Sequence, residues 1–394
     1  MVEAVRGGSS MRSVARRFGT SLLTVQRWVA RAGDAEPDLV DWSDRSRAPH
    51  RTRHVGVEVE DEVVRLRLTL TAGVLGESGP DAIHAALDAD PAFAGRVPSV
   101  RTIARILGRQ GLLADRRRVR RPPPPPGWYL PDVASRDQEL DSFDVIDDHH
   151  LTGSGVFQVL TGVSLHGGLP VAWVGPPLTG RAIVGHLLEH WAEVGLPGYA
   201  QFDNDTRFHG SHGYPDVLGP VVRACLALAV VPVFAPPGEH GFQNAVEGLN
   251  GRWEARVFHR RHHDDLEDLA AHSDAWVHAL RARLARRIEA APERREPPRQ
   301  RVHADPPPSG RMAFLRRTTD AGEATVLGRP YTVDRAWPHR LVRADLDLDA
   351  RTLSFVRLRR REPGDQQLLA VHPYEPVTSH VHPRRRRGSR ATSM

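Results

Sequence analysis

Three acidic residues stand at positions from which their carboxylates can converge: Asp144, Asp203 and Glu247. Asp144 lies between apolar Phe143 and Val145, so in a strand its side chain faces away from theirs. Carboxylates brought together from different elements supply the oxygen ligands and negative charge that two hard divalent cations, Mg²⁺ or Mn²⁺, require. Left without a cation the three charges would repel one another, so bound metal would complete such a site.

The segments that carry these acids follow an α/β pattern. Apolar runs and alternation predict strands at 140–146, 156–164, 170–174, 199–202 and 230–235. Helical spacing predicts helices at 181–194, 217–228 and 244–253. Asp144 then lies within a strand, Asp203 ends a neighbouring strand, and Glu247 lies one turn inside the last helix.

Two of the three positions have a competing acid nearby. Asp141 competes with Asp144 for the first position, and strand alternation favours Asp144. Glu239 competes with Glu247 for the third. It follows Pro-Pro-Gly in a loop and lacks the asparagines that flank Glu247 at helical spacing, so we favour Glu247.

The charges of the 394 residues are segregated along the chain. Residues 1–121 hold 21 Arg against 15 acids, residues 122–290 hold 12 Arg against 21 acids, and residues 291–394 hold 21 Arg against 12 acids, with no lysine anywhere. Two basic ends around an acidic middle are expected if the ends hold a polyanion and the middle gathers carboxylates for a cation. At 40% apolar content, the chain is too apolar to be disordered throughout.

Composition also excludes several classes of protein. The single Cys225 excludes a disulfide framework and any zinc site that needs two or more thiolates. The longest apolar stretch, residues 224–237, is interrupted by Pro232 and is shorter than the roughly 20 residues of a membrane helix. The amino terminus lacks the apolar region of an export signal. We therefore expect a cytoplasmic protein.

Residues 1–34 have the spacing of a helix-turn-helix unit. Helices expected at 13–18 and 21–32 flank Gly19, which tolerates the positive φ of a tight turn. Ala15 is small enough for a close helix crossing, and Ser21 can cap the second helix. The exposed face of that helix then offers four side chains to a DNA groove and its phosphates: Thr24, Gln26, Arg27 and Arg31.

A second helix-turn-helix-like unit is expected over residues 57–114. Its last helix starts at Ser99 and carries apolar residues on one face, at positions 100, 103, 106 and 107. Arg101 and Arg105 lie elsewhere on that helix and are candidates for DNA contact. The intervening turn, with two prolines and a glycine, is longer than in the first unit.

The remaining segments complete a multidomain chain with an all-α amino-terminal region, an α/β core and an all-β carboxy-terminal region. Strands expected at 324–333, 341–348 and 352–358 predict a small β-barrel over residues 310–378. A strand at 356–361 would present Arg357, Arg359 and Arg361 to phosphates on one face. The other boundaries are a basic and proline-rich linker at 115–134, the core at 135–290, a linker at 291–309 and a basic tail at 379–394.

Three signatures resemble those of the retroviral-integrase-like DDE transposase superfamily: Asp144, the run Phe202-Asp203-Asn204, and the run from Asn244 to Asn250 that contains Glu247. The resemblance covers about residues 135–290, and the leading helical units match the layout of bacterial insertion-sequence transposases of this kind. The family commonly has Asp-Asn-Gly where this chain has Asp203-Asn204-Asp205. A fourth carboxylate therefore either crowds the site or faces elsewhere. The interval from Asp203 to Glu247 is also longer than is usual in the family.

The resemblance implies an RNase H-like fold and a DNA transposase or integrase that cleaves and transfers strands at transposon ends. Asp144 is implied to bridge two metal ions, with Asp203 on one ion and Glu247 on the other. The partners implied are double-stranded DNA, at the transposon ends and the target, and further copies of the chain. Arg252 and Arg256 follow Glu247 on its helix and could hold phosphate. The alternative is a transposase-derived DNA-binding protein whose catalysis has lapsed.

Overall fold

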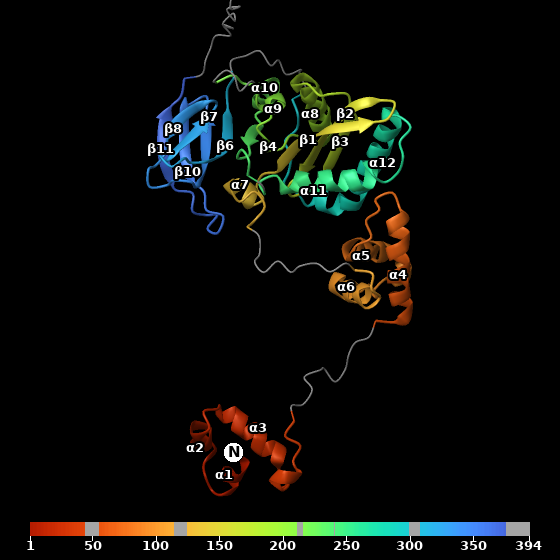
Figure 1. Cartoon of the computed structure of the whole chain (residues 1–394), viewed down its shortest axis with the longest axis vertical. Helices are drawn as coiled ribbons and strands as arrows, with labels where there is room; N and C mark the ends of the chain where they lie inside the picture. The colour runs from red at the N-terminus through yellow and green to blue at the C-terminus, as the bar shows by residue number, and fades with distance from the viewer. Residues whose placement is uncertain (44–54, 114–123, 211–215, 240, 299–307, 376–394) are drawn as a thin grey trace, which may run out of the picture. The chain divides into compact units, whose positions relative to one another are not determined.

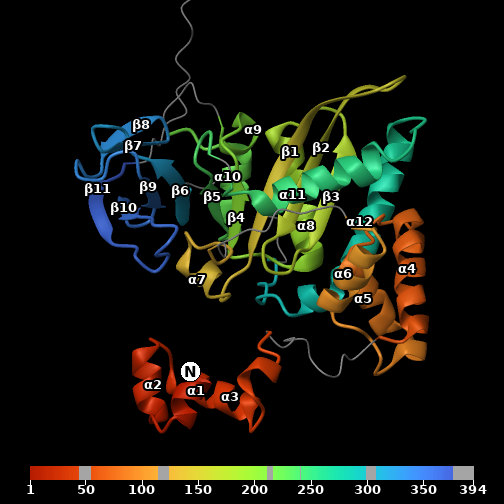
Figure 2. The same ribbon diagram turned by 60° about the horizontal axis from the view of Figure 1, so that its bottom comes forward.

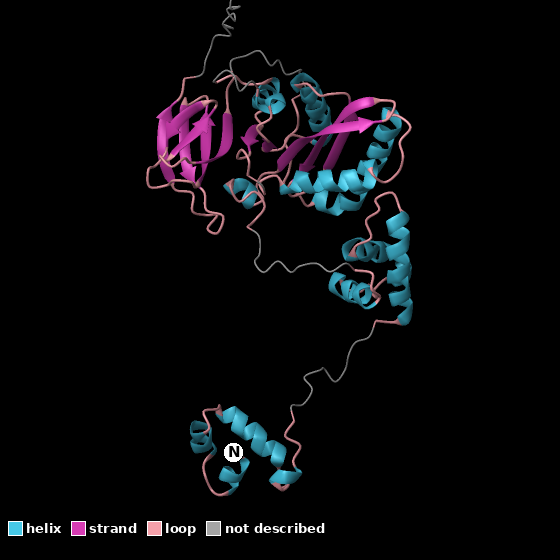
Figure 3. Ribbon diagram, viewed as in Figure 1, coloured by secondary structure: helices cyan, strands magenta, loops and turns pink. Residues whose placement is uncertain are grey.

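The computed structural model describes residues 1–43, 55–113, 124–210, 216–239, 241–298 and 308–375. The chain divides into two compact units, Met1–Gly56 and Val57–Met394. Helices form the first unit, and the described strands begin only at Leu140 (Figures 1 and 3). The predicted basic tail, 379–394, lies outside the described residues, as do residues 115–123 of the predicted first linker. No described helix is long and apolar enough to cross a membrane.

The first unit contains three short helices and a 3-10 turn: α1 (Val2–Arg6), α2 (Met11–Arg17), α3 (Leu22–Ala32) and Pro37–Leu39. Val14, Ala15 and Val25 form its buried core. The turn between α2 and α3 has Gly19 at φ +60°, and the Ser21 hydroxyl accepts the Thr24 N–H at 3.1 Å. The predicted pair of helices, their turn and the serine cap are confirmed, whereas DNA binding by this unit stays a prediction.

The second unit begins with three helices: α4 (Val57–Ala72), α5 (Pro80–Ala89) and α6 (Val100–Arg109). The Ser99 hydroxyl accepts the Thr102 N–H at 3.3 Å and starts α6, as predicted. Ile103, Ile106 and Leu107 of α6 are buried. The apolar face expected from sequence is therefore the face that packs against α4 and α5.

The α/β part is built around β1 (Leu140–Leu151). β2 (Gly155–Ser164) runs antiparallel to β1, and β3 (Pro170–Gly175) runs antiparallel to β2. On the other side, β4 (Tyr199–Phe202) pairs parallel with β1, and β5 (Val231–Phe234) pairs parallel with β4. The carboxyl ends of β4 and β5 therefore open at the same edge of the sheet, where a site can be built.

Helices cover both faces of this sheet (Figure 2). One face carries Phe143 and Phe202 against α8 and α10, and the other carries Val159 and Val163 against α11 and α12. Phe143 and Val145 both point toward α8, so strand alternation puts Asp144 on the face that α11 covers. The helices of this part are α7 (Pro131–Ala134), α8 (Gly180–Val194), α9 (Thr206–His209), α10 (Pro220–Ala227), α11 (Asn244–Trp253), which continues as a π-helical turn (Glu254–Phe258), and α12 (Leu266–Glu289).

The carboxy-terminal strands extend the core sheet. β6 pairs parallel with β5, and β9, β10 and β11 follow, so one sheet has the order β11-β10-β9-β6-β5-β4-β1-β2-β3. β7 and β8 form a separate hairpin. The all-β character of this region is as expected, but the described ladders do not close, and a separate barrel is not confirmed. The strands are β6 (Arg311–Arg317), β7 (Glu323–Val326), β8 (Arg329–Thr332), β9 (Leu341–Asp347), β10 (Thr352–Arg357) and β11 (Leu368–Pro373).

His190 of α8 is buried beneath the sheet. Its ring makes edge contacts with Phe143 and Trp173, with ring centroids at 6.4 and 6.0 Å. Burial lowers the pKa of His190 to about 4, against the opposing field of Asp141. The folded protein therefore holds this imidazole neutral at pH values where an exposed histidine begins to protonate.

We expect the free energy of unfolding to fall as the pH is lowered from about 6.5 toward about 4. In this range His190 is protonated in the unfolded chain but stays neutral in the folded protein. The full contribution is about 3 kcal/mol. Urea unfolding of the wild type and His190→Asn across this pH range measures it. Equal pH dependence in the two proteins would contradict the assignment.

Candidate functional site

Asp144 of β1 and Asp203, which follows β4, lie at the same level of neighbouring strands. Ser142 of β1 is paired with Gln201 of β4, and each aspartate lies two residues farther on. Glu247 lies in the first turn of α11, the helix that crosses the Asp144 face of the sheet (Figure 2). Topology thus directs all three predicted acids to one region of the molecule.

Two polar side chains fix Asp144. Its Oδ2 accepts a hydrogen bond from the Asn250 amide at 2.8 Å, and the Asn250 Oδ1 accepts one from the Thr161 hydroxyl at 2.6 Å. Thr161 is the cross-strand partner of Asp144 on β2. The side chain of Asp144 is therefore oriented by both a strand and the helix that carries Glu247.

The charges of Asp203 and Glu247 act on Asp144. Burial together with these two negative charges raises the pKa of Asp144 to about 6, against the bonds from the Val145 N–H and Asn250. Burial also raises the pKa of Asp203, whose Oδ1 accepts the Asp205 N–H at 3.0 Å. A cluster of this kind gains by binding a cation.

Donor type and charge fit a hard divalent cation, but the side chains are not drawn together into a ligand shell. Within the described ranges, no group of three or more His, Cys, Asp and Glu side chains is placed to hold a metal ion. The acids therefore supply the oxygen chemistry that Mg²⁺ or Mn²⁺ prefers without a completed coordination geometry.

Asp141, the competing first acid, has a structural role. Its carboxylate accepts two hydrogen bonds from Arg294, at 2.5 and 3.0 Å, and one from the Trp191 indole at 3.1 Å. It is 1% exposed. Arg295 pairs its backbone with Leu196, so the start of the predicted linker 291–309 packs on the core; residues 299–307 lie outside the described residues.

Glu239, the competing third acid, faces the carboxy-terminal strands. Both of its carboxylate oxygens accept hydrogen bonds from Arg317 of β6, at 2.5 and 2.8 Å. Its charge is thereby neutralised away from Asp144. The geometry favours Glu247 at the third position, as the helical pattern of the sequence does.

Asp205, the additional carboxylate of the Asp-Asn-Asp run, pairs with Arg207, and its charge also raises the pKa of Asp203. It caps α9 by accepting the Arg207 N–H at 2.7 Å, and its carboxylate also accepts from the Arg207 guanidinium at 2.6 and 2.9 Å. The same guanidinium donates to Asp147 of β1 at 2.6 and 2.8 Å. Arg207 therefore compensates the additional carboxylate.

Arg252 and Arg256 make contacts within the protein. Arg252 donates to Glu77 at 3.3 Å, and burial lowers the pKa of Arg252. The side chain of Arg256 lies against Gly76. Both residues contact the turn between α4 and α5, while the Arg252 side chain is 42% exposed. Their contact with phosphate stays a prediction.

The predicted strand at 356–361, with its stripe of arginines, is wrong. β10 ends at Arg357, so Arg359 and Arg361 do not continue its face. Arg357 and Arg359 both pair with Asp365 and lie over the Trp337 ring, at 5.9 and 5.3 Å from its centroid. Within the described residues these two charges are largely satisfied inside the protein.

The predicted DNA-contact residues of the two helical units differ in exposure. Gln26 and Arg27 of α3 are exposed, as are Arg101 and Arg105 of α6. The Thr24 hydroxyl is bonded to Ser21 at 2.8 Å. Arg31 donates to the Ser43 carbonyl at 2.7 Å and lies over the Trp28 ring, so it is turned toward its own unit.

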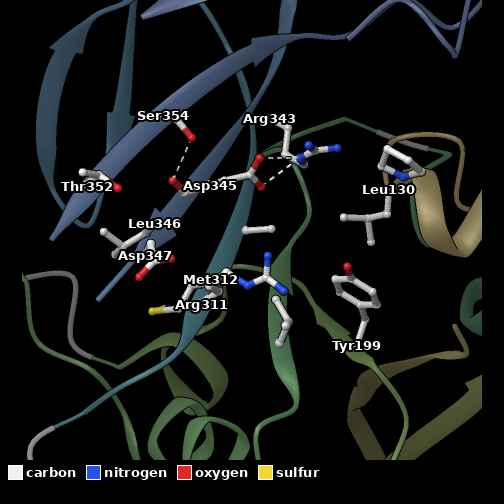
Figure 4. A pocket seen from close by; sticks show the side chains of 13 residues that line it. Leu130, Tyr199, Arg311, Met312, Arg343, Asp345, Leu346, Asp347, Thr352 and Ser354 are labelled. Carbon is white, nitrogen blue, oxygen red and sulfur yellow. Dashed lines mark hydrogen bonds and ion pairs between the residues drawn. The ribbon is translucent and has the colours of Figure 1, made fainter. Parts of the chain in front are cut away.

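A cavity of about 310 Å³ lies at the opposite edge of the sheet (Figure 4). It opens at Tyr199 and Val231, the first residues of β4 and β5. Arg343 and Asp345 line it as an ion pair at 2.8 Å. This cavity is separate from the acids, which lie toward the carboxyl ends of β4 and β5.

Sequence reasoning missed two groups around the acids. Thr161 orients Asp144 through Asn250, and only the register of β1 against β2 places it there. Arg316 contacts Asn204, next to Asp203. No signal within residues 135–290 could have indicated Arg316, because it comes from the carboxy-terminal strands.

No family model matches the sequence, and no curated protein matches it. Distant similarities to solved structures are found. The catalytic core domain of BIV integrase is 15% identical over 38% of this chain and 94% of that chain, with a TM-score of 0.29. A chain of the simian T-cell lymphotropic virus intasome in complex with PP2A regulatory subunit B56 gamma is 14% identical over 78% of this chain and 100% of that chain, with a TM-score of 0.30.

Both likenesses are distant, so the functional argument has to come from the residues of this chain. The structure is that of a mixed α/β protein in which Asp203, after β4, and Glu247, on α11, act through their charges on Asp144 of β1.

Proposed function

We propose that the protein is a DNA transposase or integrase, a DDE polynucleotidyl transferase with an RNase H-like core. The proposal rests above all on one observation: Asp144, held by Asn250, lies within the electrostatic field of both Asp203 and Glu247. The two competing acids, Asp141 and Glu239, are each paired with an arginine, which supports the same choice.

Asp144, Asp203 and Glu247 would hold two Mg²⁺ or Mn²⁺ ions. Bound ions of this kind activate an attacking oxygen and stabilise a leaving oxygen in an in-line displacement at phosphorus. Asn250 and Thr161 would keep the Asp144 carboxylate in its ligating orientation, as outer partners of metal ligands do.

The reaction proposed has two displacements at phosphorus. Water attacks the phosphodiester at the transposon end, the bond to the 3′ oxygen breaks, and a free 3′ hydroxyl remains. That hydroxyl then attacks a phosphodiester of the target and releases the target's own 3′ hydroxyl. No covalent intermediate with the protein is required.

The proposed partners are double-stranded DNA, at the transposon ends and the target, and further copies of the chain. Exposed Gln26 and Arg27 of α3 and exposed Arg101 and Arg105 of α6 are the side chains we propose to contact DNA. Because the proposed reaction takes place on chromosomal DNA, we propose that the protein is located in the cytoplasm and associates with the nucleoid.

The test is cleavage of a labelled duplex that carries the terminal repeat flanking the reading frame. We expect a 3′-processed product with Mg²⁺ or Mn²⁺ and none with a chelator. Binding of the duplex without cleavage at any concentration of either metal would refute the enzyme. That result would favour the alternative, a DNA-binding protein whose catalysis has lapsed.

Asn250→Ala is expected to slow cleavage by about 10- to 100-fold, because removing an outer partner of a ligand disturbs its orientation. Initial rates over a range of Mn²⁺ concentrations measure the effect. An unchanged rate for Asn250→Ala would show that Asp144 does not depend on this hydrogen bond.

A further inference from the structure

The molecule contains a buried guanidinium immediately beside the proposed site. Arg316 lies on β6, outside the predicted core, and is 8% exposed. We infer that Arg316 is a positioning residue for Asp203, so that the carboxy-terminal strands complete the site. The inference rests on the proposed function, because it concerns the placement of a proposed metal ligand.

The Arg316 side chain bonds three other segments of the chain and the carbonyl of its neighbour Leu315. Nη2 donates to the Asn204 Oδ1 at 3.0 Å, and Nη1 donates to the carbonyls of Ala235 at 3.3 Å and Leu315 at 2.8 Å. Nε donates to the Thr325 carbonyl at 3.0 Å. All three guanidinium nitrogens are therefore engaged, and two of them hold the loops that follow β4 and β5.

Asn204 closes this arrangement on the side of the acids. Its amide donates to the same Ala235 carbonyl at 2.6 Å, and the Ala235 N–H donates to the Phe202 carbonyl at 3.0 Å. Asp203 lies between Phe202 and Asn204, so the residues on both sides of it are tied to Ala235. Arg316 contacts both Asn204 and Ala235 and thereby fixes the backbone that carries Asp203.

The charge of Arg316 is not used in an ion pair. Among the described residues no Asp or Glu forms a salt bridge with it, and burial lowers the pKa of Arg316 to about 10. A buried cation without an anionic partner is costly, and an apolar side chain would avoid that cost. A planar guanidinium can hold several acceptors in fixed directions, which an ammonium group cannot. The directed hydrogen bonds of the guanidinium therefore explain an arginine at position 316 better than an ion pair does.

The experiment uses the full chain and compares the variants Arg316→Lys and Arg316→Met with the control Arg311→Met. Arg311 is the first residue of the same strand and lines the cavity at the other end of the sheet strands. Mn²⁺ affinity is read from the electron paramagnetic resonance signal of free Mn²⁺. We expect both Arg316 variants to bind Mn²⁺ about 10-fold or more weakly, and the control to match the wild type. Their cleavage should recover at high Mn²⁺, which a general loss of structure would not allow.

Hydrogen exchange of the peptide 202–210 gives a second readout that needs no metal. We expect faster exchange in the Arg316 variants than in the Arg311 control. If Arg316→Met does not fold, Asn204→Ala removes the same bond from the acceptor side and is read in both assays. Unchanged exchange together with unchanged Mn²⁺ affinity would overturn the inference. If the wild type binds no Mn²⁺ while exchange still rises in the variants, the proposed function fails and the positioning role stands.

Discussion

Asp144→Asn and Glu247→Gln are each expected to slow metal-dependent cleavage of the terminal-repeat duplex by at least about 1,000-fold, which corresponds to about 4 kcal/mol of transition-state stabilisation. Each change removes a charge from the three interacting acids while it leaves the shape of the side chain intact. The measurement is the single-turnover rate of 3′ processing at saturating Mg²⁺.

Glu239→Gln is the matched control for Glu247→Gln. Glu239 bonds to Arg317 on the carboxy-terminal strands, so its removal should change the rate by less than about threefold. Activity that survives both Asp144→Asn and Glu247→Gln would refute the proposed site. If Glu239→Gln lowered the cleavage rate and Glu247→Gln did not, the third acid would be Glu239 and not Glu247.

Strand and helix positions near the site could be predicted because the sequence signals are local. Alternation around Phe143 and Val145 indicates which face Asp144 takes, and the structure places both apolar residues in the core beneath α8. The bounds predicted for β4 coincide with Tyr199–Phe202. Gly19 and Ser99 mark their turn and helix start by backbone chemistry that acts within a few residues.

The partners of charged side chains could not be predicted, because they depend on contacts distant in sequence. Asp141 and Arg294 are 153 residues apart, and Arg252 and Glu77 are 175 apart. Helical spacing identifies the face on which Arg252 lies, but it cannot say that Glu77, in the turn between α4 and α5, lies against it. The intramolecular contacts of Arg252 and Arg256 could therefore not be predicted from the sequence, and their contact with DNA stays a prediction.

The expectation of a separate barrel illustrates the same limit in the sheet. The strands of the hairpin and β9 and β10 are visible in the sequence, whereas β6 and β11 were not predicted. β6 provides the connection, since it pairs with β5 on one side and β9 on the other. A strand edge can pair with any available strand, so the sequence does not indicate which strand β6 pairs with. The pairing of β6 with β5, and with it the joining of the carboxy-terminal strands to the core sheet, could therefore not be predicted.

Asp141→Asn is expected to lower the free energy of unfolding by about 3–5 kcal/mol, the cost of breaking a buried ion pair by removing one partner. The change leaves the largely buried Arg294 without its carboxylate and weakens the bond from Trp191. Urea unfolding at neutral pH, followed by tryptophan fluorescence and circular dichroism, measures the loss. Asp144→Asn should show no such loss, because it removes a carboxylate from a repulsive cluster.

The double change Asp141→Leu with Arg294→Met distinguishes the contribution of the whole ion pair from the cost of leaving one partner buried without the other. Replacing a whole buried ion pair by apolar residues is close to neutral or stabilising, so the double variant should be more stable than either single variant. A loss below about 1 kcal/mol for Asp141→Asn would mean that the ion pair contributes little, since exposed pairs are worth no more than that. Asp141 would then return as a competitor for the first acid. A large loss in Asp141→Asn and none in Asp144→Asn would divide the two aspartates of β1 into one that holds the fold and one that is available for chemistry.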